Sequence, residues 1–237
     1  MRLVRYSDRP DLIESRDLSS QVFPEFMLHN AMGPRYWRRL YEEFPDFQQA
    51  LLDGDLLVAE AHALPIPWDG TVAGLPSGWD AAFELGMDGG RKPTALSMVV
   101  ISVDPARQGE GLGGRMLEAS RDAARAAGLR AVVAPVRPTS KDRYPLAPIE
   151  SYLEWRRADG SHFDPWLRLH ERVGGKILCA APDSMVIEAP VPDWEEWTGM
   201  SFPVDGDYVV PGMLDLLRVR GGRGRHVEPN VWVSHRL

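Results

Sequence analysis

One glycine-rich segment limits the folds open to this chain more than any other feature. Residues 103–117 have the sequence VDPARQGEGLGGRML. The preceding residues 94–103 are apolar and rich in β-formers without clear alternation, which predicts a strand buried on both faces. The following residues 112–127 carry an apolar stripe at helical spacing, and Gly128 stands where a helix-ending glycine belongs. The segment is therefore expected to join a buried strand to an amphipathic helix.

A turn of this kind is suited to binding an anion. The first turn of a helix presents unpaired backbone N–H groups and the positive end of the helix dipole. Glycines lack the Cβ atoms that would hold an anion away from those amides. The expected ligand is a pyrophosphate, with positive charge from Arg107 and Arg115 nearby. The amides predicted to hold it belong to Gln108, Gly109, Gly111, Gly113 and Gly114.

Two common nucleotide-binding motifs do not explain the turn. Gly109, Gly111 and Gly114 match the dinucleotide-binding fingerprint in spacing, but that fold requires a carboxylate about 20 residues later. The next predicted strand, residues 129–136, is followed by Arg137 and carries no acid. A phosphate-binding loop of nucleotide triphosphatases is excluded as well, because the chain contains no Gly-Lys-Ser/Thr.

Predicted strands and helices surround this segment and indicate an α/β fold. Strands are expected at residues 3–6 and 56–64, as a pair at 176–181 and 185–189, and at 230–234. Helices are expected near residues 10–26, 34–52, 79–85, 149–157 and 164–174, the last with Asp164 as N-cap. A strand, a helix and a strand over residues 94–136 form a βαβ unit or a close relative.

Composition excludes several classes of protein. A formal net charge of −7 argues against a sequence-independent nucleic-acid binder, which needs a basic surface. No apolar run approaches the ~18 residues of a membrane span, and the N-terminus lacks the apolar core of a secretory signal. Cys179 is the single cysteine, so no intrachain disulfide and no multi-cysteine metal site is expected. These features favour the cytoplasm, and a homodimer is compatible with them.

Two motifs resemble those of the GNAT superfamily of N-acetyltransferases. Gln108-Gly-Glu-Gly111-Leu-Gly113 satisfies the family pattern Gln/Arg-x-x-Gly-x-Gly/Ala, and residues 169–174, LHERVG, are similar to its second landmark, Leu-Tyr-Glu-Lys-x-Gly. The resemblance covers roughly residues 56–189. It implies a GNAT-like α/β fold, a mixed central sheet flanked by helices, over residues 1–190. Residues 191–237 are then a C-terminal extension packed on the same domain.

The resemblance also implies roles for particular residues. The donor would be acetyl-CoA or another acyl-CoA. The amide of Ile101 falls near the thioester oxygen, and Val103 falls at the pantetheine contact. His170 replaces the tyrosine that commonly protonates the thiolate, and a histidine is well matched to neutral pH. Ser97 occupies the position where many members carry a carboxylate base.

The acceptor and its base are less closely defined by the sequence. Glu60 and His62, on the adjacent strand, are candidates for binding the acceptor or removing its proton, and Arg137 and Thr139 for holding a carboxylate. We expect a short acyl group to pass directly to the amine of a small molecule, so Cys179 is not a proposed nucleophile. Two alternatives stay open. One is a GNAT-like decarboxylase and S-acyltransferase that loads a carrier protein, and the other is a non-catalytic acyl-CoA-binding protein.

Overall fold

The computed structural model describes residues 1–14 and 18–237 and has the predicted α/β architecture. A single mixed sheet follows the order β1-β2-β3-β4-β5-β9-β8-β7, and β6 pairs with the other edge of β9. The β4–β5 pairing is parallel and the others are antiparallel. The strands are β1 (Arg2–Arg5), β2 (Gln49–Asp53), β3 (Leu56–Ile66), β4 (Ala95–Val103), β5 (Ala131–Val136), β6 (Lys176–Pro190), β7 (Gly206–Tyr208), β8 (Leu217–Arg220) and β9 (Arg223–Arg236).

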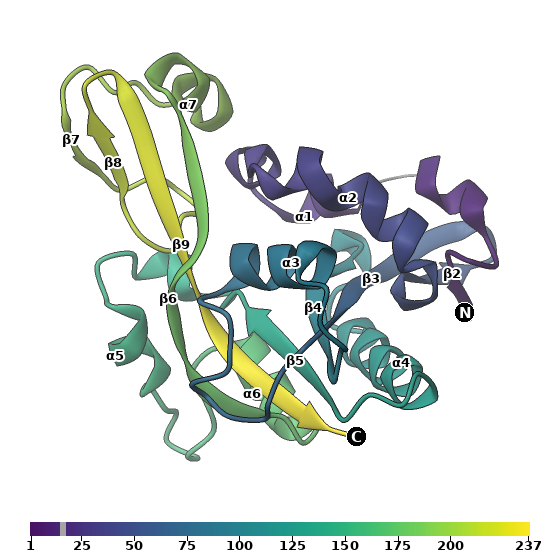
Figure 1. The fold of residues 1–237 in the computed structure, drawn as a ribbon. Helices are drawn as coiled ribbons and strands as arrows, with labels where there is room; N and C mark the ends of the chain where they lie inside the picture. Colours follow the sequence, from purple (N-terminus) through teal and green to yellow (C-terminus); the bar gives the residue numbers. More distant parts are fainter. Residues whose placement is uncertain (15–17) are drawn as a thin grey trace.

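Helices cover both faces of the sheet. The α-helices are α1 (Ser19–Val22), α2 (Met32–Glu43), α3 (Trp79–Asp88), α4 (Leu112–Ala126), α5 (Ile149–Leu153), α6 (Pro165–Arg172) and α7 (Val191–Thr198). Short 3-10 segments are η1 (Pro10–Glu14), η2 (Glu25–His29), η3 (Pro45–Phe47), η4 (Pro105–Arg107) and η5 (Lys141–Arg143). Figure 1 shows α2 and α3 on one side of the sheet and α4 and α6 on the other.

The side chains of β4 alternate between the two resulting cores. Leu96 and Met98 pack with Met116 of α4 and Leu167 of α6. Ala95 and Val99 pack on the other face with Tyr36 of α2 and Phe83 of α3. The absence of polar–apolar alternation in β4 is thus explained by burial on both faces, as the sequence predicts.

Three segments differ from the sequence-based expectation. Residues 49–53, expected to continue a helix, form β2, because Pro45 ends the helical run and their side chains enter the sheet beside β3. The helix expected over residues 10–26 is three short pieces, η1, α1 and η2, and residues 15–17 lie outside the described residues. Residues 176–190 form one long strand in place of two short strands paired with each other.

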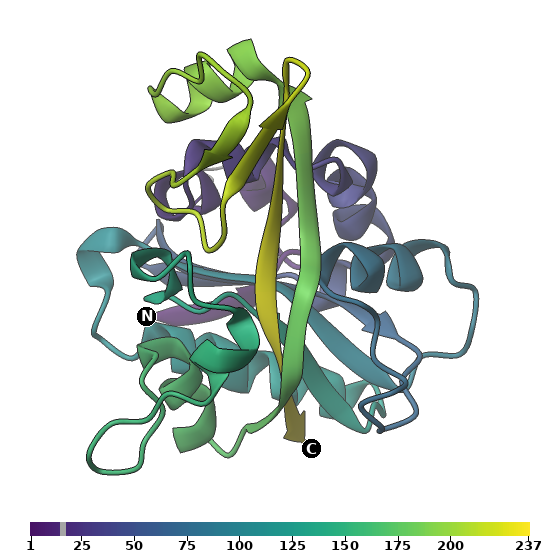
Figure 2. The same cartoon turned by 90° about the vertical axis from the view of Figure 1, so that its left-hand side faces the viewer.

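The C-terminal segment supplies the sheet with an inner strand. The C-terminal half of β9 pairs with both β5 and β6, and its N-terminal half pairs with β6 and β8. Figure 2 shows β6 and β9 running together beyond the rest of the sheet, and Figure 1 shows α7, β7 and β8 at their far end. We call the projecting part of the β6 and β9 pair, together with α7, β7 and β8, the arm. Residues 191–237, expected as an extension, therefore contribute β9 to the interior of the domain.

Candidate active site

The glycine turn has the geometry that its sequence predicts. Gly109 and Gly111 have backbone φ angles of +86° and +79°, which residues with a side chain rarely adopt. A Cβ atom at either position would meet nothing within 4 Å. Going along the turn into the helix, Arg115 is the first residue whose backbone amide donates a hydrogen bond back to the turn. It donates to the Gly111 carbonyl at 3.2 Å. Within the described chain, the backbone amides of residues 108–114 donate no hydrogen bond of this kind to another backbone carbonyl. These amides remain available for an anionic ligand at the start of α4.

The charges beside the turn are more balanced than the sequence indicates. The guanidinium of Arg107 lies 2.7 Å from Glu110 and 3.0 Å from Asp53, and its hydrogen bonds to these carboxylates raise its pKa. Arg115 is exposed and reaches the sulfur of Met1. The backbone amides and the helix dipole are therefore the main groups available to attract an anion here.

A gap opens between β4 and β5 next to the turn. In the described part of the chain the two strands pair only through Ala95–Ser97 of β4, so no described strand lies on that side of its second half. The amide of Asp104 donates to Val58 of β3 at 3.0 Å. Since N–H directions alternate along a strand, the amides of Val103 and Ile101 point away from β3 and into the gap. Both residues are half-buried.

An irregularity in pairing lies at the beginning of this gap. The register of β3 with β4 shifts between His62 and Ala63, so that Val100 pairs with His62 while Met98 pairs with Ala63. The extra residue is Val99, whose carbonyl accepts a hydrogen bond from the Trp79 indole at 2.7 Å. Bulges of this type re-aim a strand near functional sites. Ser97, at the expected position of a base, is fully buried, and its hydroxyl has no hydrogen-bond partner in the described chain.

His170 lies in a buried histidine pair that the sequence does not reveal. Its Nδ1 is 2.9 Å from Nε2 of His235 on β9, and its ring meets Trp166 edge-on. Trp166 in turn lies beside Gly113, since a Cβ there would be 3.1 Å from the indole. Nε2 of His170 and Nδ1 of His235 have no partner among the described residues. The pair thus lies between α6 and β9, and His170 is one helical turn from Trp166, which packs against Gly113.

Burial decides the charge of this pair. It lowers the pKa of His170 to about 3, with a contribution from His235, and burial together with the Arg121 charge lowers the pKa of His235 to about 4. The expectation that His170 titrates near neutral pH is therefore wrong. Both rings are neutral at pH 7, and one donates its N–H to the other.

Glu60 and His62 lie together at the base of a pocket, on the α2 face of β3. Their side chains are 4% and 1% exposed, and His62 Nε2 is 3.4 Å from Glu60 Oε2. The pocket has a volume of about 470 Å³ and is walled by Tyr6, Trp37 and Tyr41. A strand position that alternates with apolar neighbours is usually solvated, so sequence reasoning alone could not predict this burial.

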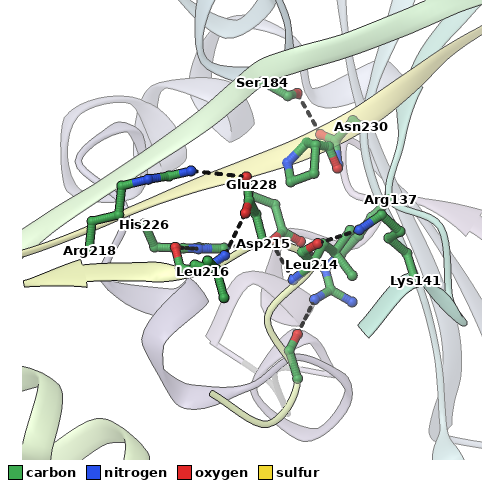
Figure 3. Close-up of polar contacts among 12 residues, drawn as sticks. Arg137, Lys141, Ser184, Leu214, Asp215, Leu216, Arg218, His226, Glu228 and Asn230 are labelled. Carbon is green, nitrogen blue, oxygen red and sulfur yellow. Dashed lines mark hydrogen bonds and ion pairs between the residues drawn. The ribbon is translucent and has the colours of Figure 1, made fainter. Parts of the chain in front are cut away.

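Arg137 and Lys141 make internal contacts at the other end of the site. Arg137 donates from Nε to Glu228 and from Nη2 to the Gly212 carbonyl at 2.5 Å, and His226 lies 2.7 Å from Glu228 (Figure 3). Burial raises the pKa of Glu228, but the Arg137 charge and the His226 contacts lower it by more. Lys141 is buried and donates to the carbonyl of Leu214. Thr139 is exposed.

Glu228 and His235 were missed because both lie on β9, far from every recognisable motif. Each is charged or polar within a strand that is buried on both faces, and such residues need a partner. That pattern could have marked them as site or structural residues once residues 223–236 were identified as a strand.

No residue group in the described chain forms a metal site of three or more ligands, and no described helix is long and apolar enough to cross a membrane.

Comparison with known proteins supplies the family. The family model of the acetyltransferase (GNAT) family matches residues 27–147, about half of the chain. An arginine N-acetyltransferase of Aspergillus versicolor is 29% identical over 96% of this chain and 91% of its own length.

Solved structures show the same fold. The loading GNATL domain of CurA from Lyngbya majuscula has a TM-score of 0.63 at 20% identity and covers 99% of this chain and 96% of its own. The GphF GNAT-like decarboxylase in complex with isobutyryl-CoA has a TM-score of 0.59 at 19% identity, and the match covers 100% of this chain and 99% of that structure's chain. With the glycine turn and the gap in the sheet, these findings establish that the chain belongs to the acetyltransferase (GNAT) family and is an acyl-coenzyme A-dependent N-acyltransferase.

Proposed function

We propose that the protein transfers an acetyl or other short acyl group to an amine of a basic small molecule, for which arginine, the acceptor named for the relative, is the first candidate. The observation that carries the proposal is the arrangement around β4. The glycine turn and the free amides of Ile101 and Val103 lie at its gap with β5, and the Glu60 pocket opens on the neighbouring strand. Donor and acceptor can then meet at one point of the sheet.

The donor is held by backbone groups in this proposal. The amides of Gln108, Gly109, Gly111, Gly113 and Gly114 bind the pyrophosphate, with Arg107 at the edge. Val103 binds the pantetheine arm. The donor supplies an activated thioester whose carbonyl oxygen gains negative charge during attack. The amide of Ile101 stabilises that charge, and such a fixed donor is worth roughly 3 kcal/mol of the barrier.

The acceptor nitrogen forms the new C–N bond as the C–S bond breaks. One proton leaves the amine to solvent water, and Glu60 with His62 is proposed to hold the acceptor from the neighbouring strand. The departing sulfur is stabilised by His170, which acts as a neutral N–H donor because its pKa is too low for an imidazolium. Arg137 and Thr139 form the β5 end of the proposed acceptor site, where Arg137 acts by fixing Glu228.

Direct attack is supported by the state of Cys179. The thiol is half-buried in β6, and burial raises its pKa, so little thiolate forms at pH 7. We expect Cys179→Ala to retain the wild-type rate.

An acceptor panel tests the proposal. Purified protein is given acetyl-CoA with arginine, agmatine, ornithine, an aminoglycoside or a phosphopantetheinyl carrier protein, and CoA release and product mass are followed. We expect an acetylated amine from one or more of the basic small molecules. Acylation of the carrier thiol alone would overturn the proposal, as would tight CoA binding without turnover on any acceptor.

A further inference from the structure

The pocket over Glu60 is built as a site for a cation. Its volume of about 470 Å³ matches a small organic group, and its lining combines one carboxylate with three aromatic rings. The rings of Tyr6, Trp37 and Tyr41 each lie 5.4 Å from the imidazole of His62 at steep angles. Aromatic walls around a carboxylate favour a flat or compact cation, because ring faces attract positive charge.

The hydrogen bonds that Glu60 makes are too few and too long for a buried carboxylate. The Tyr6 hydroxyl donates to Oε2 at 3.2 Å and the Ser19 hydroxyl to Oε1 at 3.5 Å. In the part of the chain that the structure describes, no Lys or Arg forms an ion pair with Glu60. Arg38 also lines the pocket, but its side chain is 91% exposed and pairs with Glu42. A buried carboxylate with only neutral, long contacts is costly unless a charged donor is added.

His62 does not supply that donor in its neutral form. The side-chain amide of Gln48 donates to the carbonyls of Phe44 and Ala63 at 2.7 and 2.8 Å, so its oxygen must be the atom that faces His62 Nδ1 at 3.2 Å. Nδ1 therefore carries the proton, and Nε2 of the neutral ring presents a lone pair toward Glu60. With Nε2 3.4 Å from Glu60 Oε2, the carboxylate has no close charged partner among the described residues.

We propose that this pocket binds the guanidinium or primary ammonium group of the acceptor, with Glu60 as its counter-ion and Trp37 and Tyr41 as its walls. A guanidinium offers five N–H donors in a plane, which fills the unused acceptor positions of Glu60. The inference deepens the proposed function, because it names the acceptor class.

The position of the pocket fits this role. Glu60 pairs with Ser102 and His62 with Val100, so the pocket floor is one strand away from the gap beside β4. Neighbouring strands are about 4.8 Å apart. An extended basic side chain therefore spans from the pocket to the thioester position.

Binding of L-arginine and of L-citrulline, its uncharged analogue, is compared by calorimetry with CoA present. We expect wild type to bind arginine at least tenfold more tightly than citrulline. Glu60→Gln should lower arginine affinity roughly 10- to 100-fold and leave citrulline unchanged. Trp37→Leu should weaken arginine by a smaller factor. Glu150→Gln removes an exposed carboxylate on α5 and should change neither affinity.

CoA affinity, measured for each variant, shows whether it is folded, and the wild-type comparison of the two ligands requires no variant. Equal binding of arginine and citrulline by wild type would overturn the inference. So would unchanged arginine affinity in a Glu60→Gln protein that still binds CoA. Charge-dependent arginine binding without any acetylated product would support this pocket while contradicting the proposed function. Acetyl transfer at the same rate to charged and uncharged acceptors would support the proposed function while contradicting this role of the pocket.

Discussion

His170 and His235 show how burial changes what a residue can do. A histidine at the position of the family tyrosine looks like an acid suited to neutral pH, yet desolvation holds the pKa of His170 to about 3. The ring can still donate a hydrogen bond from Nε2 if His235 donates to its Nδ1. A neutral donor stabilises a developing thiolate without transferring a full charge.

We therefore expect His170→Ala to lower kcat by about 10²-fold, as for loss of one donor to a developing anion, with KM for acetyl-CoA nearly unchanged. His170→Tyr should recover part of the rate, since a phenol donates from a similar place. The ratio of wild-type to variant kcat should be flat between pH 6 and 8. A ratio that falls off with an apparent pKa of 6–7 would show that His170 acts as an imidazolium.

The same pair predicts how stability depends on pH. The unfolded chain protonates both histidines below about pH 6.5, while the folded protein keeps them neutral down to about 4 and 3. Stability is therefore complete above pH 6.5 and falls as pH decreases. At pH 5 the loss is on the order of 2 kcal/mol for each ring.

Melting temperature should consequently drop by several degrees between pH 7.5 and pH 5. His170→Phe should remove about half of this drop, because one of the two titrating rings is gone. Glu118 and Arg121 of α4 also face His235, so Glu118→Gln serves as a control for their contribution. A drop of equal size in His170→Phe would contradict this account.

At the scale of elements, the start of α4 is the feature most completely encoded in local sequence. Gly111 and Gly128 flank this helix with similar φ angles of +79° and +69°, and a Cβ at either meets nothing within 4 Å. A side chain at either position should cost similar backbone strain, about 1 kcal/mol. Only Gly111 lies where the pyrophosphate is proposed to bind.

Gly111→Leu is thus expected to reduce CoA affinity by more than 100-fold, and Gly128→Leu to leave it within about twofold, at similar loss of melting temperature. Calorimetry with CoA and thermal melts measure both quantities. Equal CoA affinity in the two variants would remove the glycine turn from the donor site.

Local sequence predicted some elements and missed others for identifiable reasons. Helix α6 begins as predicted because Asp164 accepts from the amides of Trp166 and Leu167, a contact that sequence spacing alone encodes. The sequence predicts strand β9 only over residues 230–234, although it spans Arg223–Arg236, because Gly224 and Pro229 weaken the local β signal of the preceding residues. Its length depends on β5, β6 and β8, which are distant in sequence. Likewise the partners of Glu60 and His170 come from other elements.

At the scale of the whole molecule, the arm is joined to the sheet through a buried ion pair. Arg137 follows β5, and Glu228 lies on β9 where the arm leaves the sheet (Figure 3). The Gly212 carbonyl, which also accepts from Arg137, comes from the loop before β8. Glu228 is fully buried, so removing either charge leaves the other uncompensated.

Glu228→Gln or Arg137→Met should each lower the free energy of unfolding by roughly 3 kcal/mol, and the double variant should lose less than the sum. Denaturant melts of the four proteins measure this coupling. Arg225→Gln provides a control, since its ion pair with Glu188 is exposed and should contribute at most about 1 kcal/mol. Additive losses would mean that Arg137 and Glu228 act independently.

Direct acyl transfer between two substrates bound at one sheet is the central step of the proposed function, and product analysis tests it most directly. Protein, acetyl-CoA and arginine are mixed, and the masses of the acceptor and of the intact protein are followed with the release of CoA thiol. We predict one acetylated arginine for each CoA released and no change in the mass of the protein. CoA release without acetylated acceptor, or an acetyl group retained on the protein, would contradict direct acyl transfer to an amine.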